Sequence, residues 1–195
     1  ITLFFLCCIL AAIIYPGSQK EIIGYKSNIY SFTHNFLSEL GSLRTNTDEK
    51  NPLIIQKDNT PSMILFNGSL ILVGITLMLY YIHFKKVFTI IEDSDKTKFF
   101  ANITMPVGIL AGFFFAGVGF VPHDLHFPTH VFFANYAFLT LFFLCILHSI
   151  TIYYSNFLGN NYVIGYITFC ILLFIYLRII FFGPQIGPNR IYSEK

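Results

Sequence analysis

The chain contains no tryptophan and few charged residues. Trp is absent from all 195 positions, and 11% of the residues are charged, compared with about 25% in a soluble domain. With so few charges, most of the surface must face lipid or other apolar groups, which excludes an ordinary soluble domain. Because Trp is missing, tyrosine has to supply the aromatic belt at a membrane interface. Tyrosines do lie at the ends of the apolar runs, at Tyr80, Tyr81, Tyr153, Tyr154 and Tyr162.

The chain also lacks a basic stripe and a cysteine framework. Its formal net charge is +2, and no run of basic residues interleaves with aromatic ones, so we expect no nucleic-acid partner. The cysteines lie inside apolar runs, where they are typical of small buried hydrophobic residues and not of disulfides or zinc ligands. They are Cys7, Cys8, Cys145 and Cys170.

What the chain does have is long apolar runs, at residues 62–81, 101–121, 130–153 and 162–182. Each is about 20 residues long, which is the length a helix needs to cross a hydrocarbon core of about 30 Å. A fifth run, 1–15, is shorter and lacks the charged leader of a signal peptide. We interpret it as an incomplete first span.

These runs predict an all-α fold, a polytopic transmembrane helical bundle in one transmembrane domain, 1–195. The expected spans are about 1–15, 62–83, 100–121, 128–154 and 162–182. The chain stops abruptly after Lys195, so we expect a sixth span beyond it. The positive-inside rule assigns the loop 84–99 to the cytoplasm, because it holds Lys85, Lys86, Lys96 and Lys98.

The long loop 16–61 is then extracytoplasmic and shares its side with residues 122–127 and the C-terminal tail. Five basic residues in this loop work against the assignment: Lys20, Lys26, Arg44, Lys50 and Lys57. Within it, Ile29, Phe32, Phe36, Leu37 and Leu40 fall on one helical face, and Gly41 is a suitable stop. This pattern predicts a short amphipathic helix over 27–40 at the membrane interface, followed by a flexible loop.

The third apolar run carries small residues at helical spacing, namely Gly108, Gly112, Ala116 and Gly119. They share one face, where a second helix can approach closely and gain van der Waals contact. The stripe predicts helix packing and no chemistry.

Most of the residues that could carry chemistry lie on the expected outer side. Imidazole and carboxylate groups are ligands for zinc and non-haem metals, and His34, Asp124, His126 and His130 are the candidates, with His123 beside them. Ser38 or Glu39 could polarise water. Pro128 lies between His126 and His130 and favours a helix start, so these two rings need not converge. The alternative is a wet interfacial cap in which His and Asp satisfy helix ends.

Two ionisable residues lie within or near the later spans. His148 is the deepest, and a neutral imidazole bonded to a neighbouring carbonyl is the simpler alternative to a proton relay. Arg178 can extend to the interface and could bind a lipid phosphate. The repeated intramembrane charges of an ion-coupled transporter are absent from the sequence.

Several short motifs occur in a familiar order: Ser38-Glu39-Leu40-Gly41, Asn59-Thr60-Pro61, Leu65-Phe66-Asn67, and the series from Gly117 to His126. This series resembles the membrane-protein family known as domain of unknown function 998 (DUF998) and is more remotely similar to the Frag1/DRAM/Sfk1 group. The resemblance implies a six-span helical protein with no settled activity. The remoter group is associated with lipid remodelling and membrane trafficking. A further analogy is to alkaline ceramidases, which hold zinc with Ser, Asp and three His, but the closing His-x-x-x-His of those enzymes is missing here.

We therefore expect an integral membrane protein that acts as an accessory or structural subunit, with membrane lipids and other membrane-protein subunits as partners. The alternative is a metal-dependent membrane hydrolase or lipid-modifying enzyme, with zinc or another divalent metal at the outer His/Asp site. A small transporter or channel is a third interpretation.

Overall fold

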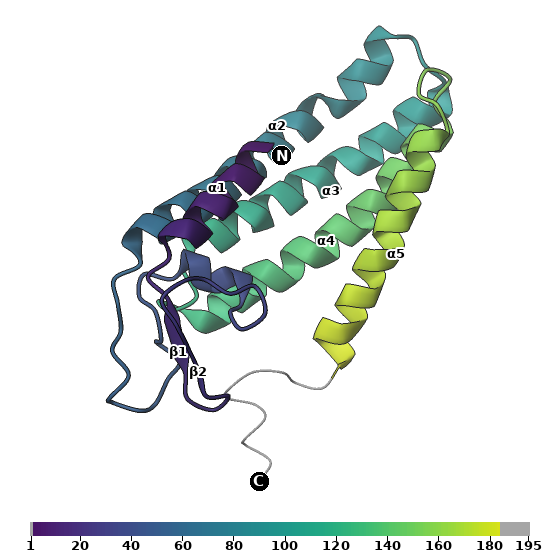
Figure 1. The fold of residues 1–195 in the computed structure, drawn as a ribbon. Coiled ribbons are helices and arrows are strands. Elements are labelled where there is room, and N and C mark those ends of the chain that lie inside the picture. The colour runs from purple at the N-terminus through teal and green to yellow at the C-terminus, as the bar shows by residue number, and fades with distance from the viewer. Residues whose placement is uncertain (1, 184–195) are drawn as a thin grey trace. The chain divides into compact units, whose positions relative to one another are not determined.

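The structure is a computed structural model that describes residues 2–183. Its elements, in chain order (Figure 1), are α1 (Thr2–Ile14), β1 (Ser18–Lys20), β2 (Tyr25–Ser27), the 3₁₀ helix η1 (Leu37–Gly41), α2 (Thr60–Ile90), α3 (Asp95–Phe120), α4 (Phe127–Tyr153) and α5 (Asn161–Phe182). The two strands pair antiparallel, with Gln19 opposite Lys26.

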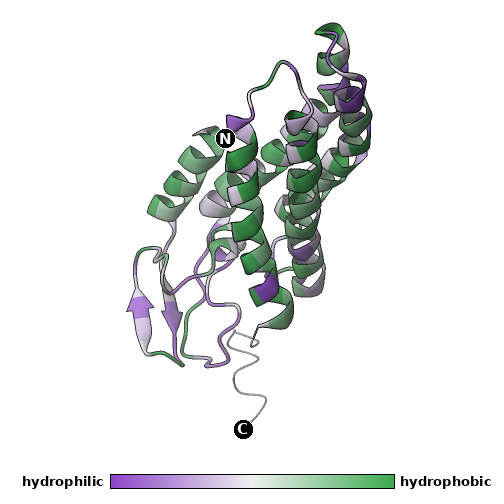
Figure 2. Ribbon diagram, turned by 90° about the vertical axis from the view of Figure 1, so that its right-hand side faces the viewer, coloured by the Kyte–Doolittle hydropathy of each residue, from purple (hydrophilic) through white to green (hydrophobic). Residues whose placement is uncertain are grey.

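Helices α2 to α5 are each long and apolar enough to cross a membrane. Figure 2 shows hydrophobic residues along these helices and hydrophilic residues on the two strands. The predicted all-α membrane architecture is confirmed to this extent. α1 is a shorter apolar helix of 13 residues, so a fifth span stays a prediction, as does a sixth beyond Lys195. The C-terminal tail, assigned above to the outer side, lies outside the described residues.

The predicted loop 84–99 is wrong, because α2 continues to Ile90 and α3 already begins at Asp95. Residues 84–90 contain no Gly or Pro to end a helix. The start of α3 is fixed by Ser94, whose hydroxyl accepts a hydrogen bond from the backbone N–H of Thr97 at 3.1 Å, as an N-cap residue does. The four lysines of the predicted loop therefore project from helix ends.

The predicted amphipathic helix over 27–40 is not present as an α-helix. β2 takes up Ser27, turns follow, and η1 covers the last residues. Polar side chains bind the local backbone instead: Asn35 accepts from the N–H of Ser31 at 3.2 Å, and Glu39 accepts from the N–H of Phe36 at 3.0 Å. Such bonds compete with the helical hydrogen-bond ladder.

The described residues form two compact units, 2–73 with 115–133 (unit 1) and 74–114 with 134–183 (unit 2). Helices α2, α3 and α4 each contribute residues to both. In unit 1 the core joins the end of α1, the loop and the start of α2; its buried members are Ala11, Tyr15, Tyr30, Leu40, Phe66 and Leu70. The loop 16–61 is thus tied to membrane helices by apolar contacts.

The core of unit 2 joins α2, α3 and α4 through Tyr81, Phe84, Phe88, Ala101, Ala111 and Leu144. The predicted stripe of small residues on α3 faces α2 within each unit. In unit 2, a Cβ on Gly112 would lie 2.5 Å from the carbonyl oxygen of Gly74. In unit 1, a Cβ on Gly119 would lie 2.5 Å from the carbonyl oxygen of Asn67, and Ala116 is buried.

Candidate functional site

The main polar site of unit 1 forms where η1 meets the start of α2. Carbonyls at the end of a helix have no partner within it, and here side chains of α2 and its preceding residue supply the donors. The bonds run from Asn59 Nδ2 to the carbonyls of Glu39 (3.2 Å), Leu40 (3.3 Å) and Ser42 (2.8 Å), from Ser62 Oγ to Leu40 (3.0 Å), and from Asn67 Nδ2 to Gly41 (2.9 Å).

Gly41 allows this close contact. A Cβ at position 41 would lie 2.2 Å from Oδ1 of Asn67 and 2.9 Å from the ring of Phe66. Any side chain there would therefore separate η1 from α2. The glycine of the Ser38-Glu39-Leu40-Gly41 motif has a structural role.

Glu39 is the centre of a buried charge network. Its Oε1 accepts from the N–H of Phe36 at 3.0 Å and pairs with Lys20 Nζ at 3.2 Å. Its Oε2 accepts from Asn35 Nδ2 at 2.8 Å and from the hydroxyl of Tyr15 at 3.5 Å. Glu39 is 7% exposed, so both carboxylate oxygens are occupied inside the protein. Ser38, the other predicted catalytic residue, is partly buried beside it.

Lys20 is the cation of this network and also pairs with Asp48 at 3.2 Å. Burial by itself would lower the pKa of Lys20, but the negative charges of Glu39 and Asp48 outweigh burial and hold the pKa above its ordinary value. The lysine is therefore kept charged, as a buried cation with two carboxylate partners should be.

A second polar cluster lies on the α3–α4 connection, again in unit 1. His123 Nδ1 and Ser42 Oγ are 2.9 Å apart, and Asp124 Oδ2 accepts from the N–H of Arg44 at 3.0 Å. His130 is buried and donates from Nδ1 to the carbonyl of Val121 at 2.7 Å. These bonds attach the connection to the segment that follows η1, so the two predicted outer segments do lie together.

The rings of His123 and His130 are close, with centroids 5.9 Å apart and planes at 62°. Each ring uses its Nδ1 for a protein hydrogen bond, which leaves Nε2 as the nitrogen that could meet a ligand. Beside them, Oδ1 of Asp124 is buried and has no hydrogen-bond partner within the described residues. Buried polar atoms normally have a partner.

The other predicted metal ligands make local contacts. His34 stacks on Tyr25 with centroids 4.1 Å apart, and its Nδ1 lies 3.0 Å from Ser31 Oγ. His126 is exposed, and its Nδ1 accepts from the N–H of Thr129 at 3.3 Å in the first turn of α4.

Asp124 and His130 are thus brought into one cluster with His123, whereas His34 and His126 bond within their own segments. Among residues 2–183, no three His, Cys, Asp or Glu side chains are arranged to hold a metal ion. The zinc site stays a prediction.

In unit 2, His148 is buried and its Nδ1 lies 3.0 Å from the hydroxyl of Tyr81. Its ring also contacts the rings of Phe84 and Tyr166, at centroid distances of 4.9 and 4.6 Å. The partner is a tyrosine hydroxyl and not the backbone carbonyl expected from the sequence. Arg178 is exposed on α5 with its guanidinium 4.7 Å from the ring centroid of Phe182.

Sequence reasoning missed the role of Asp93, which ties two turns of unit 2. Its buried carboxylate accepts from the hydroxyl of Ser155, from the N–H of Asn156 at 2.8 Å and from the N–H of Ser94 at 2.7 Å. Burial alone would raise the pKa of Asp93, but these hydrogen bonds outweigh it and lower the pKa. The signal in the sequence is the pair Asp93-Ser94 before α3, which is typical of a helix cap.

Comparisons with protein-family models, curated proteins and solved structures found no match for this chain. The resemblance to DUF998 and to the Frag1/DRAM/Sfk1 group therefore stays a prediction.

Proposed function

We propose that this membrane protein is an accessory or structural subunit that works by packing against a partner membrane protein or lipids, and that α5 is the packing helix. The observation that carries the proposal is the exposure of α5. Of an apolar 18-residue stretch of α5, 17% is buried inside the protein, whereas 50% of the corresponding stretch of α3 is buried. A helix that is apolar on all sides needs an apolar environment around it.

A protein partner is favoured over lipid alone by the small residues on the open side of α5. Gly165 is exposed, and a Cβ added there would have no neighbour within 4 Å. Thr168, one turn later, is also exposed and turns its hydroxyl back to the carbonyl of Ile164 at 2.9 Å. Such small or self-satisfied residues let a second helix come close in a bilayer.

The state of Glu39 supports a role without catalysis. A carboxylate that already binds Lys20, Asn35 and the backbone is poorly placed to take a proton from water. Its contacts support an assignment as part of the scaffold that fixes the loop 16–61 on the membrane helices.

Site-specific photo-crosslinking in native membranes tests the proposal. A benzophenone side chain at Ile171, which is exposed on α5, should give one adduct of defined mass that the same group at the buried Leu173 does not give. Native mass spectrometry of the unmodified complex in mild detergent should show the same added mass. A monomer without added subunits, together with lipid adducts alone at Ile171, would contradict a protein partner.

The second candidate is a metal-dependent membrane hydrolase or lipid-modifying enzyme. The pairing of His123 with His130 beside the unpartnered oxygen of Asp124 favours it. A catalytic zinc usually has three protein ligands, and the described residues present no such group, so we rank this candidate below the first.

Metal analysis separates the two candidates. The enzyme interpretation expects zinc or iron at about one ion per chain in protein purified without chelator, and its loss in His123→Ala and His130→Ala. Metal-free protein, with membrane lipid composition unchanged by either substitution, would end it.

A further inference from the structure

We infer that the segment 29–37, which is not helical up to Phe36, inserts its apolar side chains into the lipid interface beside α1. Four large apolar side chains of this segment are exposed, namely Ile29, Phe32, Phe36 and Leu37. Phe32 is the most exposed of them at 71%. The inference concerns lipid contact by the loop and does not depend on the partner proposed for α5.

Buried side chains and hydrogen bonds fix this segment, so its exposed apolar side chains have defined positions. Between the exposed residues, Tyr30 and Asn35 are buried, and Leu40 follows in the core. Asn35 donates to Ser18 Oγ at 2.7 Å and to Glu39 at 2.8 Å, which fixes the polar side of the segment toward β1 and η1. The apolar side is left facing outward.

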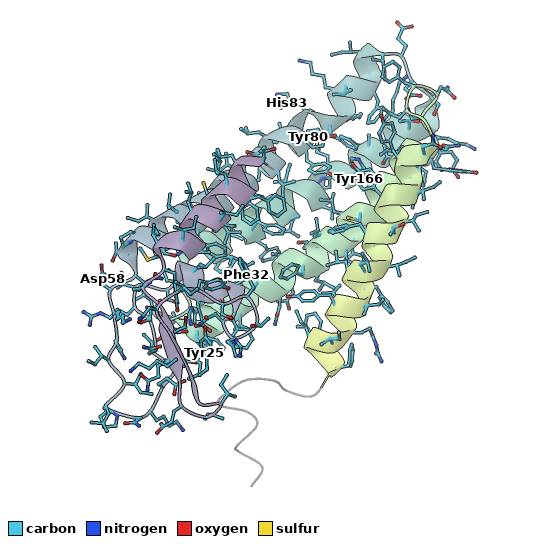
Figure 3. The ribbon with its side chains drawn as sticks, viewed as in Figure 1. Tyr25, Phe32, Asp58, Tyr80, His83 and Tyr166 are labelled. Carbon is cyan, nitrogen blue, oxygen red and sulfur yellow. The ribbon has the colours of Figure 1, made fainter. Side chains whose placement is uncertain are left out.

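A series of aromatic contacts connects Phe32 to the end of α1. The ring of Phe32 meets that of Tyr30 at a centroid distance of 4.9 Å, and Tyr30 meets Tyr15 at 5.3 Å. Tyr15 directly follows α1, and both tyrosines belong to the core cluster with Phe66 of α2. Figure 3 labels Phe32 on the side of the loop toward the helices, with Tyr25 farther out on the hairpin.

The depth of this cluster can be read from α2. Phe66 comes six residues after Thr60, the first residue of α2, which is about 9 Å along the helix axis. Tyr30 thus belongs to one core cluster with a residue in the second turn of a helix that is long enough to cross a membrane. Aromatic residues concentrate at this level in membrane proteins, and this chain has no Trp to fill it.

Lipid is the occupant that these contacts favour, because the exposed side chains continue the apolar surface of α1. Ile9, Ile13 and Ile14 are also exposed on α1, and the bilayer must cover them if the helix lies in it. By contrast, Leu53 and Ile55 are exposed in the same loop but are flanked by Asn51, Gln56, Lys57 and Asp58. We assign that second stretch to water.

The absence of native Trp makes a direct test available, since one substitution creates the sole tryptophan of the chain. The full chain carrying Phe32→Trp is reconstituted in phosphatidylcholine vesicles, with or without lipids brominated near the headgroup end of their acyl chains. We expect a blue-shifted emission that loses most of its intensity with brominated lipid and resists iodide in the buffer. Phe36→Trp should behave in the same way and serves if the first variant does not fold.

Two control variants give the signals expected for a tryptophan in lipid and for a tryptophan in water. Ile64→Trp, exposed on α2, should be quenched by brominated lipid and shows that the protein has inserted. Leu53→Trp, at a residue 85% exposed, should emit as in water and be quenched by iodide alone. The inference is overturned if Ile64→Trp reports insertion while Phe32→Trp and Phe36→Trp are quenched by iodide, or are shielded from both quenchers, since the latter would mean that protein covers the segment.

Discussion

The ring of Tyr81 lies so close to Gly108 that a Cβ at position 108 would stand 2.0 Å from the ring carbon Cγ. The same tyrosine hydrogen-bonds His148 of α4 through its hydroxyl. The side chain of Tyr81 on α2 thus packs against α3 and hydrogen-bonds α4, and both contacts lie inside unit 2. The ring cannot move away from a new side chain on α3 without weakening the bond to His148.

Gly108→Ala should therefore destabilise the protein. Overpacking of this kind costs about 1–3 kcal/mol, and we expect a lower midpoint of thermal unfolding in mild detergent. Gly68→Ala is the matched control, because Gly68 is exposed in α2, a Cβ there meets nothing within 4 Å and Ala favours the helix. Equal midpoints for the two variants would show that the Tyr81–Gly108 contact does not limit packing.

Glu39→Gln should destabilise the connection between the loop 16–61 and the membrane helices. The substitution removes the negative charge opposite the buried Lys20, which keeps its second pair, with Asp48. Loss of a hydrogen bond to a charged group costs about 1.5–3 kcal/mol, measured as a lower thermal midpoint or as faster proteolysis of the loop.

Asp95→Asn provides the control for this prediction. Asp95 pairs with Lys98 at 3.5 Å with its side chain fully exposed, and exposed pairs contribute little. We expect no measurable change. A stable Glu39→Gln variant, with the loop as resistant to protease as in the parent, would argue that the network is not needed for the fold.

Asp93 should make unit 2 sensitive to acid. Its pKa is lower in the folded protein than its ordinary value because Ser155 and backbone N–H groups bind the carboxylate. A depressed folded pKa gives stability that is present above the unfolded value of about 3.9 and is lost as pH falls through the folded value.

Asp93→Asn should accordingly lower the unfolding midpoint at neutral pH and reduce the loss of stability seen below about pH 4 in the parent chain. Unfolding curves at pH 7 and at a series of acid pH values measure both effects. Glu92→Gln, at the exposed neighbour, should leave the acid profile as it is. An unchanged profile in Asp93→Asn would remove Asp93 as its source.

The proposed sidedness can be measured by cysteine labelling. The native cysteines Cys7, Cys8, Cys145 and Cys170 all lie in apolar helices, where a membrane-impermeant maleimide reacts poorly. Thr47→Cys should then be labelled on intact cells, and Thr89→Cys, near the end of α2, should be labelled after permeabilisation alone. The reverse pattern would invert the topology derived from the lysine-rich segment.

Hydropathy and helix signals in the sequence were sufficient to predict where α2, α4 and α5 begin. The runs at 62–83, 128–154 and 162–182 become α2, α4 and α5 with starts that agree to within two residues. Hydrophobic length is a property of consecutive residues and requires no knowledge of distant contacts. The predicted end of α2 at 83 is wrong because charged residues do not by themselves end a helix, and lysines are good helix formers.

The sequence by itself determined that this chain builds apolar helices and which face of α3 carries small residues, because both depend on local composition and spacing. The tertiary structure decided how the polar residues are used. Glu39 meets Lys20, and Asn59 binds the carbonyls of η1, because the core of unit 1 brings the loop onto α2. The bonds of Ser42 to His123 and of Arg44 to Asp124 likewise join segments far apart in the chain, which no local pattern encodes.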